Sequence, residues 1–192
     1  MAVTGDRFKQ NVGRKLTFPQ VLALPGVEEH VELRSRFGFM AFHGGNLERR
    51  TEQIAHDAAE LSGSSLYRVI QPLGTRHHFP SATVVAEHSA ALAKFMEHCE
   101  VVIAIHGFGK SGHWDDLLCG GQNRTLAAHA GRHLSAVLPE RYNVVTNLED
   151  IPKKLRGVHP SNPVNQVSGG GMQLELPPGI RGLTPAAAKF PT

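Results

Sequence analysis

Residues 39–55, FMAFHGGNLERRTEQIA, pass from an apolar segment through a His-Gly-Gly turn into a helical pattern. We predict a buried strand over residues 36–42 that delivers His43 to the rim of a sheet. The two glycines that follow allow the backbone to turn, because glycine adopts conformations that other residues avoid. Glu48 can then lie beside His43, so this short stretch supplies two polar groups to one place.

A helix is expected after this turn, over residues 51–63, with Thr51 as its N-cap and Gly63 as its stop. A second strand then ends in the same way as the first. Residues 99–108, CEVVIAIHGF, form a continuous apolar run of the kind that is buried on both faces of an α/β sheet, and the run ends at His106 and a glycine.

Strands and helices alternate along the chain. The other expected helices cover residues 18–24, a segment that ends near residue 98, and residues 122–138; the other expected strands cover residues 27–33, 64–70, 117–121, 142–147 and 172–176. Residues 148–170 are expected to form a long loop. The alternation predicts an α/β fold, a three-layer sandwich with a mostly parallel or mixed central sheet flanked by helices. The length of 192 residues fits a single domain over residues 1–192, with residues 1–15 as a loose N-terminal arm.

The composition narrows the class of protein. The chain is 41% hydrophobic and 19% charged, with no apolar run of about 18 residues, so no membrane-spanning helix and no membrane partner are expected. No apolar segment follows the start methionine, so we expect no signal peptide and a cytoplasmic protein that lysis could release. The net charge of +3 and the pI of about 9.1 favour anionic partners. Lysine and arginine form no block, so nucleic acid is not the expected partner.

His43 and His106 each follow the last residue of a predicted strand, and ligand sites in α/β sheets gather at the carboxyl ends of the strands. If the two strands are neighbours, both imidazoles and Glu48 converge. Two imidazoles, one carboxylate and a water molecule are a ligand set of catalytic zinc, which lowers the pKa of the bound water towards about 7. Each histidine taken alone would equally suit a hydrogen-bonded residue at the rim of the core.

Hydrolysis of an amide also needs a group that takes a proton from water and gives it to the leaving nitrogen. Glu175, in the predicted strand GGGMQLELPP, is the candidate because its apolar neighbours Leu174 and Leu176 occupy the other face of the strand. Burial in a cleft would raise the pKa of Glu175 into a useful range. The alternative is an ordinary glutamate on an exposed strand face.

Four segments in the same order resemble the poly-γ-glutamate hydrolase family of phage-type zinc peptidases, which is related in fold to the zinc carboxypeptidases. They are AFHGGNLERRTEQIA, VVIAIHGF, LLCGGQNRTLAAHAGRHL and GGGMQLELPPGIR, and the resemblance extends from about residue 36 to residue 181. It implies that His43, Glu48 and His106 bind one zinc ion and that Glu175 is the catalytic carboxylate. Gln166 departs from the family pattern, which often has arginine there.

An anionic substrate would be bound by arginine, whose guanidinium grips carboxylates through two hydrogen bonds. Arg181 and Arg124, both inside the resembling segments, are the candidates for substrate binding, with Arg76 as a third. His78 and Ser81 are weaker matches to the family.

The sequence therefore predicts a zinc-dependent hydrolase of amide bonds, acting on γ-glutamyl linkages in poly-γ-glutamate. The expected partner is an acidic polypeptide or an acyl amino acid. One alternative is an amidohydrolase of small N-acyl amino acids. The other is a basic nucleic-acid-binding α/β module without catalysis, in which the histidines are structural.

Overall fold

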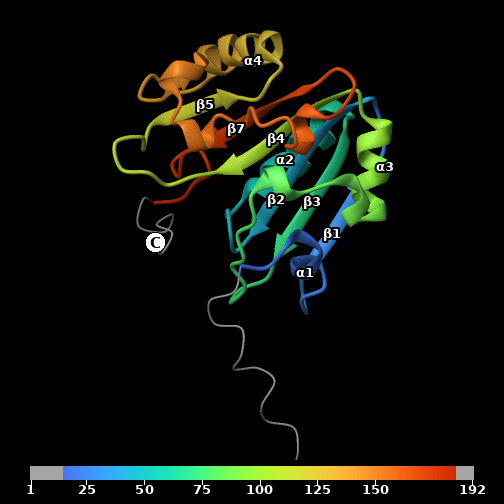
Figure 1. Cartoon of the computed structure of the whole chain (residues 1–192). Helices are drawn as coiled ribbons and strands as arrows, with labels where there is room; N and C mark the ends of the chain where they lie inside the picture. The colour runs from blue at the N-terminus through green and yellow to red at the C-terminus, as the bar shows by residue number, and fades with distance from the viewer. Residues whose placement is uncertain (1–14, 185–192) are drawn as a thin grey trace, which may run out of the picture.

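The structure, a computed structural model, describes residues 15–184. Within these residues a seven-stranded mixed sheet forms the centre of the molecule, in the strand order β1-β3-β2-β4-β7-β5-β6 (Figure 1). The strands are β1 (Glu28–Glu32), β2 (Phe37–Gly45), β3 (Ser65–Gln71), β4 (Val101–Gly107), β5 (Asp116–Gly120), β6 (Asn143–Val145) and β7 (Gly171–Leu176). β1 runs antiparallel to β3 and β5 runs antiparallel to β7, whereas the other neighbouring pairs are parallel.

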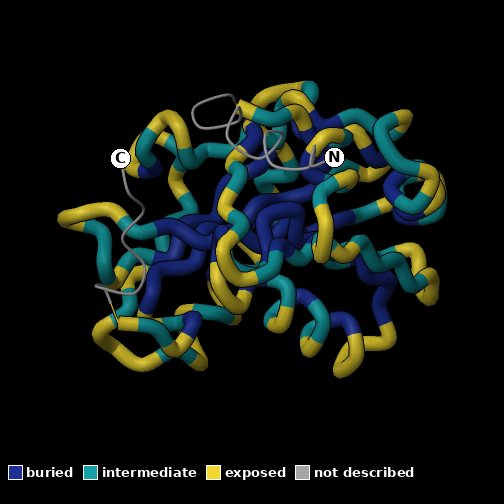
Figure 2. Tube along the Cα trace, turned by 90° about the horizontal axis from the view of Figure 1, so that it is seen from below, coloured by how far each residue is buried: buried dark blue, intermediate teal, exposed yellow. Residues whose placement is uncertain are grey.

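Helices cover both faces of the sheet. They are α1 (Phe18–Leu22), α2 (Thr51–Ser62), α3 (Ala90–His98) and α4 (Arg124–Val137). Met40 and Phe42 of β2 pack on one face in a cluster with residues of α1 and α3. Ala41, which points the other way, packs in a second cluster with residues of α2 and α4. The predicted α/β three-layer sandwich is therefore confirmed, and its buried strands lie between exposed outer segments (Figure 2).

The first unit differs from its prediction in two details. β2 continues through Gly44 and Gly45, which pair with β3 at Ile70 and Gln71, instead of ending at residue 42. The helix α2 begins at Thr51 itself, after Arg50 in a left-handed conformation (φ 71°), so Thr51 is not the N-cap. Gly63 ends the helix as predicted, in a left-handed conformation (φ 63°).

Other boundaries shift for local reasons. Ser89 accepts hydrogen bonds from two amides at the start of α3, so this helix begins only at Ala90. The expected long loop at 148–170 contains three short 3₁₀ helices, which are Leu148–Asp150, Lys153–Leu155 and Pro163–Asn165. Apart from residue 15, the arm expected at residues 1–15 lies outside the described residues.

The sheet places the ends of three parallel strands together, because β2, β4 and β7 are consecutive in the sheet. His43, His106 and Glu175 belong to the carboxyl-terminal parts of these strands. Within residues 15–184 we find no helix that combines the length and the apolar character needed to cross a membrane.

Candidate metal centre and active site

His43 owes its position to the glycines that follow it. The pairing of β2 with β3 shifts register between Ala41 and Gly44, a bulge of the kind that redirects side chains. A Cβ atom on Gly44 would lie 2.6 Å from the Val69 carbonyl oxygen. Gly45 has φ 71°, and a Cβ there would lie 2.2 Å from the Gln71 carbonyl oxygen. Side chains are therefore excluded at both positions, and the strand can bend close to β3.

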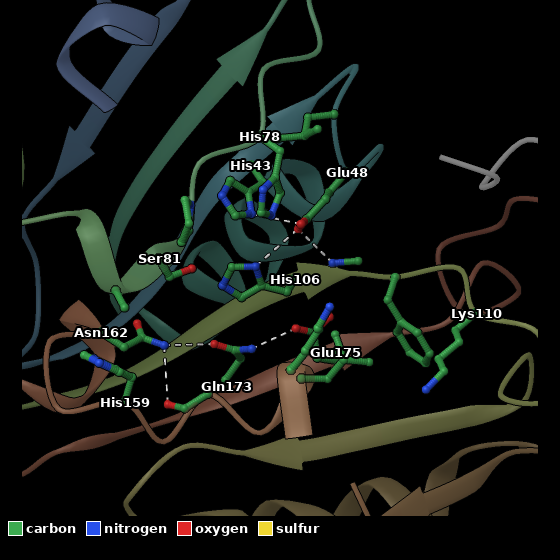
Figure 3. A pocket seen from close by; sticks show the side chains of 18 of the residues that line it. His43, Glu48, His78, Ser81, His106, Lys110, His159, Asn162, Gln173 and Glu175 are labelled. Atoms are coloured by element: carbon green, nitrogen blue, oxygen red, sulfur yellow. Dashed lines mark hydrogen bonds and ion pairs between the residues drawn. The ribbon is translucent and has the colours of Figure 1, made fainter. Parts of the chain in front are cut away.

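The turn after β2 brings Glu48 back to the histidine. The amide of Glu48 donates to the carbonyl oxygen of His43 at 2.8 Å, which closes the turn. The carboxylate then reaches two imidazoles: Oε1 lies 2.8 Å from His43 Nδ1 and Oε2 lies 3.3 Å from His106 Nδ1. The amide of Gly107 also donates to Oε2, at 2.9 Å. All of these side chains are buried, and they face one another in Figure 3.

The donor set fits a metal ion. One ligand atom from each of His43, Glu48 and His106 can be chosen so that all three lie within 4.8 Å of one another. His43 Nε2 lies 2.9 Å from the carbonyl oxygen of Phe79, and a carbonyl only accepts, so Nε2 carries the proton. A second partner of this type is usual for metal-binding histidines, and it directs Nδ1 towards Glu48, where a metal ion would lie. The three side chains could therefore hold a divalent cation.

The electrostatics of this cluster favour a positive charge beside Glu48. Burial opposes ionisation of Glu48, but the imidazoles of His43 and His106 outweigh it and hold the pKa of this carboxyl well below its usual range. Burial likewise opposes the charged form of His106, yet the carboxylate of Glu48 raises the pKa of this imidazole. The buried anion is stabilised by positive charge, which a bound cation would also provide.

Glu175 lies directly beside His106, because these two residues are partners in the parallel pairing of β4 with β7. Gln173 Nε2 donates to Glu175 Oε1 at 2.7 Å, and Asn162 Nδ2 donates to Gln173 Oε1 at 3.1 Å. Burial raises the pKa of Glu175 from 4.5 to about 7, although the charge of His106 opposes this shift. A carboxyl with such a pKa can both accept and donate a proton near neutral pH.

A cavity of about 1220 Å³ opens over this cluster, and His43, Glu48, His106 and Glu175 belong to its lining. Among residues 15–184, cationic side chains outnumber anionic ones in its lining. The lining includes Arg76, Lys110, Lys153 and Lys154, whereas Glu48 and Glu175 are its acidic members. The cavity therefore suits a ligand that carries negative charge at some distance from the reacting bond.

The profile of a family described as Poly-gamma-glutamate hydrolase matches residues 23–184. The chain belongs to this poly-γ-glutamate hydrolase family. It is therefore a hydrolase. A comparison with curated proteins found no significant match.

Solved structures of the same fold include a bacteriophage poly-γ-glutamate hydrolase, with 23% sequence identity and a TM-score of 0.65 over 81% of this chain and 72% of that one. A second, described as "YNDL-apo (Zinc-free)", has 23% identity and a TM-score of 0.67 over 81% of this chain and 74% of that one.

Within this poly-γ-glutamate hydrolase family member, the structure places four of the predicted site residues in the lining of the cavity and two outside it. His43, Glu48, His106 and Glu175 all line the cavity. Arg181 and Arg124, expected to bind substrate, do not belong to its lining. Arg76, the third arginine considered, does, as do His78 and Ser81.

Arg124 lies at the opposite end of the sheet from the site, near the start of β7. It begins α4, which follows β5, and β5 runs antiparallel to β7, so this end of β5 adjoins the start of β7 rather than its end. The guanidinium donates to the carbonyl oxygens of Gly121, at 3.0 Å, and of Cys119 and Thr146. The expected substrate-binding role of Arg124 does not fit this position.

Arg181 is buried, with 2% of its surface exposed, and its guanidinium is bonded to backbone carbonyls. It is therefore close to the site without being open to a ligand in the cavity. The departure at Gln166 also has no direct effect on the cavity, because neither Gln166 nor its neighbour Asn165 belongs to the lining. Asn165 instead accepts a hydrogen bond from the amide of Gln122 and donates to the carbonyl oxygens of Gly157 and His159.

Sequence reasoning missed Gln173, Asn162 and the lysines of the cavity. Gln173 could have been found, because residues two apart on a strand share a face and Glu175 was already a candidate. Asn162, Lys153 and Lys154 lie in the segment read as a long loop, and Lys110 lies in the connection from β4 to β5. Residues in such segments have no periodicity that would place them over the site.

Proposed function

We propose that the protein is a zinc-dependent hydrolase that cleaves γ-glutamyl amide bonds in an acidic polypeptide. The observation that carries the proposal is the buried cluster of His43, Glu48 and His106 that faces a cavity beside Glu175. Two imidazoles and a carboxylate are the protein ligands of a common class of catalytic zinc sites. Zinc is the metal we assign because a structure of the same fold is described as a zinc-free form.

Each side chain of the cluster has a distinct task in this proposal. His43, Glu48 and His106 would hold the ion, and the hydrogen bond from His43 to Phe79 would fix the orientation of its ring. A bound zinc ion would act as a Lewis acid that polarises the scissile carbonyl and activates water.

Glu175 would move the proton. As a carboxylate it accepts a proton from the attacking water, and as a carboxylic acid it returns this proton to the leaving nitrogen. In the metal-free protein burial raises its pKa to about 7, so both forms are accessible near neutral pH. Gln173 donates to Oε1, so we assign the transfer to Oε2, and the hydrogen bond keeps the carboxyl group from rotating.

The basic lining explains why the substrate would be acidic. In a γ-glutamyl polymer every residue carries a free α-carboxylate, so a bound chain presents negative charge on both sides of the scissile bond. Lys110, Lys153, Lys154 and Arg76 would attract these carboxylates.

The test combines metal analysis with a comparison of substrates. The purified protein should contain about one zinc ion per chain, lose activity with a chelator and regain it with zinc. Wild-type protein should shorten poly-γ-glutamate, as followed by size-exclusion chromatography. Cleavage of small N-acyl amino acids alone would contradict the assigned substrate and favour an amidohydrolase.

Glu175→Gln is the matched variant, because it keeps the size of the side chain and removes its acid-base function. It should retain zinc and lose about 100-fold to 10,000-fold in kcat, the range typical of general acid-base catalysis. Turnover at the wild-type rate would exclude Glu175 as the proton-transfer group.

A further inference from the structure

The side chain of Arg181 donates hydrogen bonds to three backbone carbonyl groups. Its Nε donates to the carbonyl oxygen of Leu176 at 3.1 Å. Its Nη1 donates to the carbonyl oxygen of Arg49, and its Nη2 to that of Phe108, both at 3.0 Å. One rigid planar group therefore joins three segments that are far apart in the sequence.

Each of these segments carries a residue of the proposed site. Arg49 directly follows Glu48 in the sequence. Leu176 directly follows Glu175. The third acceptor lies two positions after His106. The guanidinium thus connects the backbone that follows the proposed metal ligands Glu48 and His106 with the backbone that follows the proposed proton-transfer group Glu175.

Arg181 holds these segments from the side of the sheet opposite the cavity. A Cβ atom on Gly107 would lie 2.7 Å from Arg181 Cζ, so the guanidinium packs directly against this glycine. Successive side chains of a strand point to opposite faces, and His106 faces the cavity. The same glycine donates its amide hydrogen to Glu48 Oε2. Arg181 therefore supports the backbone that orients Glu48 and cannot itself contact a ligand in the cavity.

We propose that Arg181 is a positioning residue that fixes the spacing of Glu48, His106 and Glu175, and thereby sets both metal affinity and turnover. This inference rests on the proposed zinc-dependent hydrolysis. The positive charge of Arg181 also interacts favourably with the carboxylates of Glu48 and Glu175. Arginine is required because a planar guanidinium donates in several fixed directions, whereas the ammonium group of lysine is compact and lies at the end of a flexible stem.

Arg181→Lys keeps the charge and removes the three-way contact. The matched control is Arg124→Lys, because Arg124 also donates to three backbone carbonyls but lies at the other end of the sheet. Three quantities should be measured for each variant and the wild type: zinc affinity by competition with a chelator, kcat and KM with poly-γ-glutamate, and the thermal stability of the metal-free protein.

We expect Arg181→Lys to weaken zinc binding and to lower kcat, each by about 10-fold to 100-fold, as for other residues that support metal ligands. KM should change much less, because the residue does not contact the substrate. Arg124→Lys should lose comparable stability while zinc affinity and kcat stay within about twofold of wild type. This difference between the two variants would distinguish a residue that positions the site from one that only stabilises the fold.

Wild-type zinc affinity and kcat in a folded Arg181→Lys variant would overturn the inference, and so would a raised KM with unchanged kcat. If this variant does not fold, Arg50→Gln decides, because Arg50 is exposed and its Nη1 donates to the Arg181 carbonyl oxygen. A fall of at least about threefold in zinc affinity supports the inference, and values within about twofold of wild type refute it. The affinity measurement needs no substrate, so it remains decisive even if the proposed substrate is wrong.

Discussion

Replacing Glu175 by glutamine should stabilise the metal-free protein, and the gain should grow with pH. In the folded protein burial raises the pKa of Glu175 from 4.5 to about 7. A carboxyl whose pKa is raised by folding resists ionisation, so its contribution to stability is fully present below the unfolded pKa and is lost as pH rises through the folded one. Glutamine stays neutral and avoids this loss.

The magnitude follows from the difference between the two pKa values, which is about 2.5 pH units. One pH unit corresponds to about 1.36 kcal/mol, so the penalty on wild type above neutral pH is roughly 3 kcal/mol. At about pH 5, where the unfolded carboxyl is largely ionised and the folded one is not, the penalty is only roughly 1 kcal/mol. Glu175→Gln should therefore exceed wild type in stability by these amounts.

Urea unfolding of chelator-treated protein, followed by circular dichroism at about pH 5 and about pH 8, measures both differences. Glu100→Gln is the control, because Glu100 is exposed and pairs with Arg36 on the surface. This control should stay within roughly 0.5 kcal/mol of wild type at both pH values, as expected for an exposed ion pair. An equal or smaller stability of Glu175→Gln at about pH 8 would refute the assignment of a buried carboxyl that resists ionisation.

Three other changes test the metal, the substrate and the core. His106→Ala should lower zinc affinity by at least about 100-fold because it removes one of three proposed ligands, and zinc retained at the wild-type level in elemental analysis would exclude this ligand. Replacing Lys153 and Lys154 together by glutamine should raise KM for poly-γ-glutamate by about tenfold with little change in kcat. The control Lys94→Gln, at an exposed position on α3, should match wild type. An unchanged KM in the double variant would contradict the role of this basic pair. Burial raises the pKa of the Cys119 thiol to about 12. This thiol should therefore resist alkylation at about pH 8 in the folded protein and react after unfolding, which mass spectrometry can follow. Equal alkylation rates in the folded and unfolded states would contradict its burial.

The strands of this fold, and the residues at their ends, could be predicted from the sequence. The apolar run before His106 and the His-Gly-Gly turn after residue 42 placed two imidazoles at the same edge of the sheet, because the carboxyl ends of parallel strands meet there. The approximate position of Glu48 followed from the turn alone. These inferences depend on local chemistry, which the sequence displays directly.

Contacts between distant segments could not be predicted in the same way. The sequence predicts Arg181 as a substrate-binding residue because of its charge, but its hydrogen bonds to the backbone at residues 49, 108 and 176 depend on how distant segments pack. The reversed direction of β5, and with it the position of Arg124, depends on strand pairing that no local pattern encodes. Lys153 and Lys154 approach the cavity because a loop folds over the sheet, and loops carry no periodic signal.

The antiparallel direction of β5 also makes one loop suitable for engineering. Because β5 is antiparallel to β7, it starts beside the end of β7, and residues 108–115 are enough to connect the end of β4 to the start of β5. A strand parallel to β7 would start at the opposite end of the sheet, and reaching it would need a long crossover connection. Phe108, Gly109 and Lys110 border the cavity, and Ser111 and Gly112 form an exposed tip. Insertions at this tip would lengthen the wall of the cavity and leave both flanking strands in place, which makes the loop a natural position for altering substrate range.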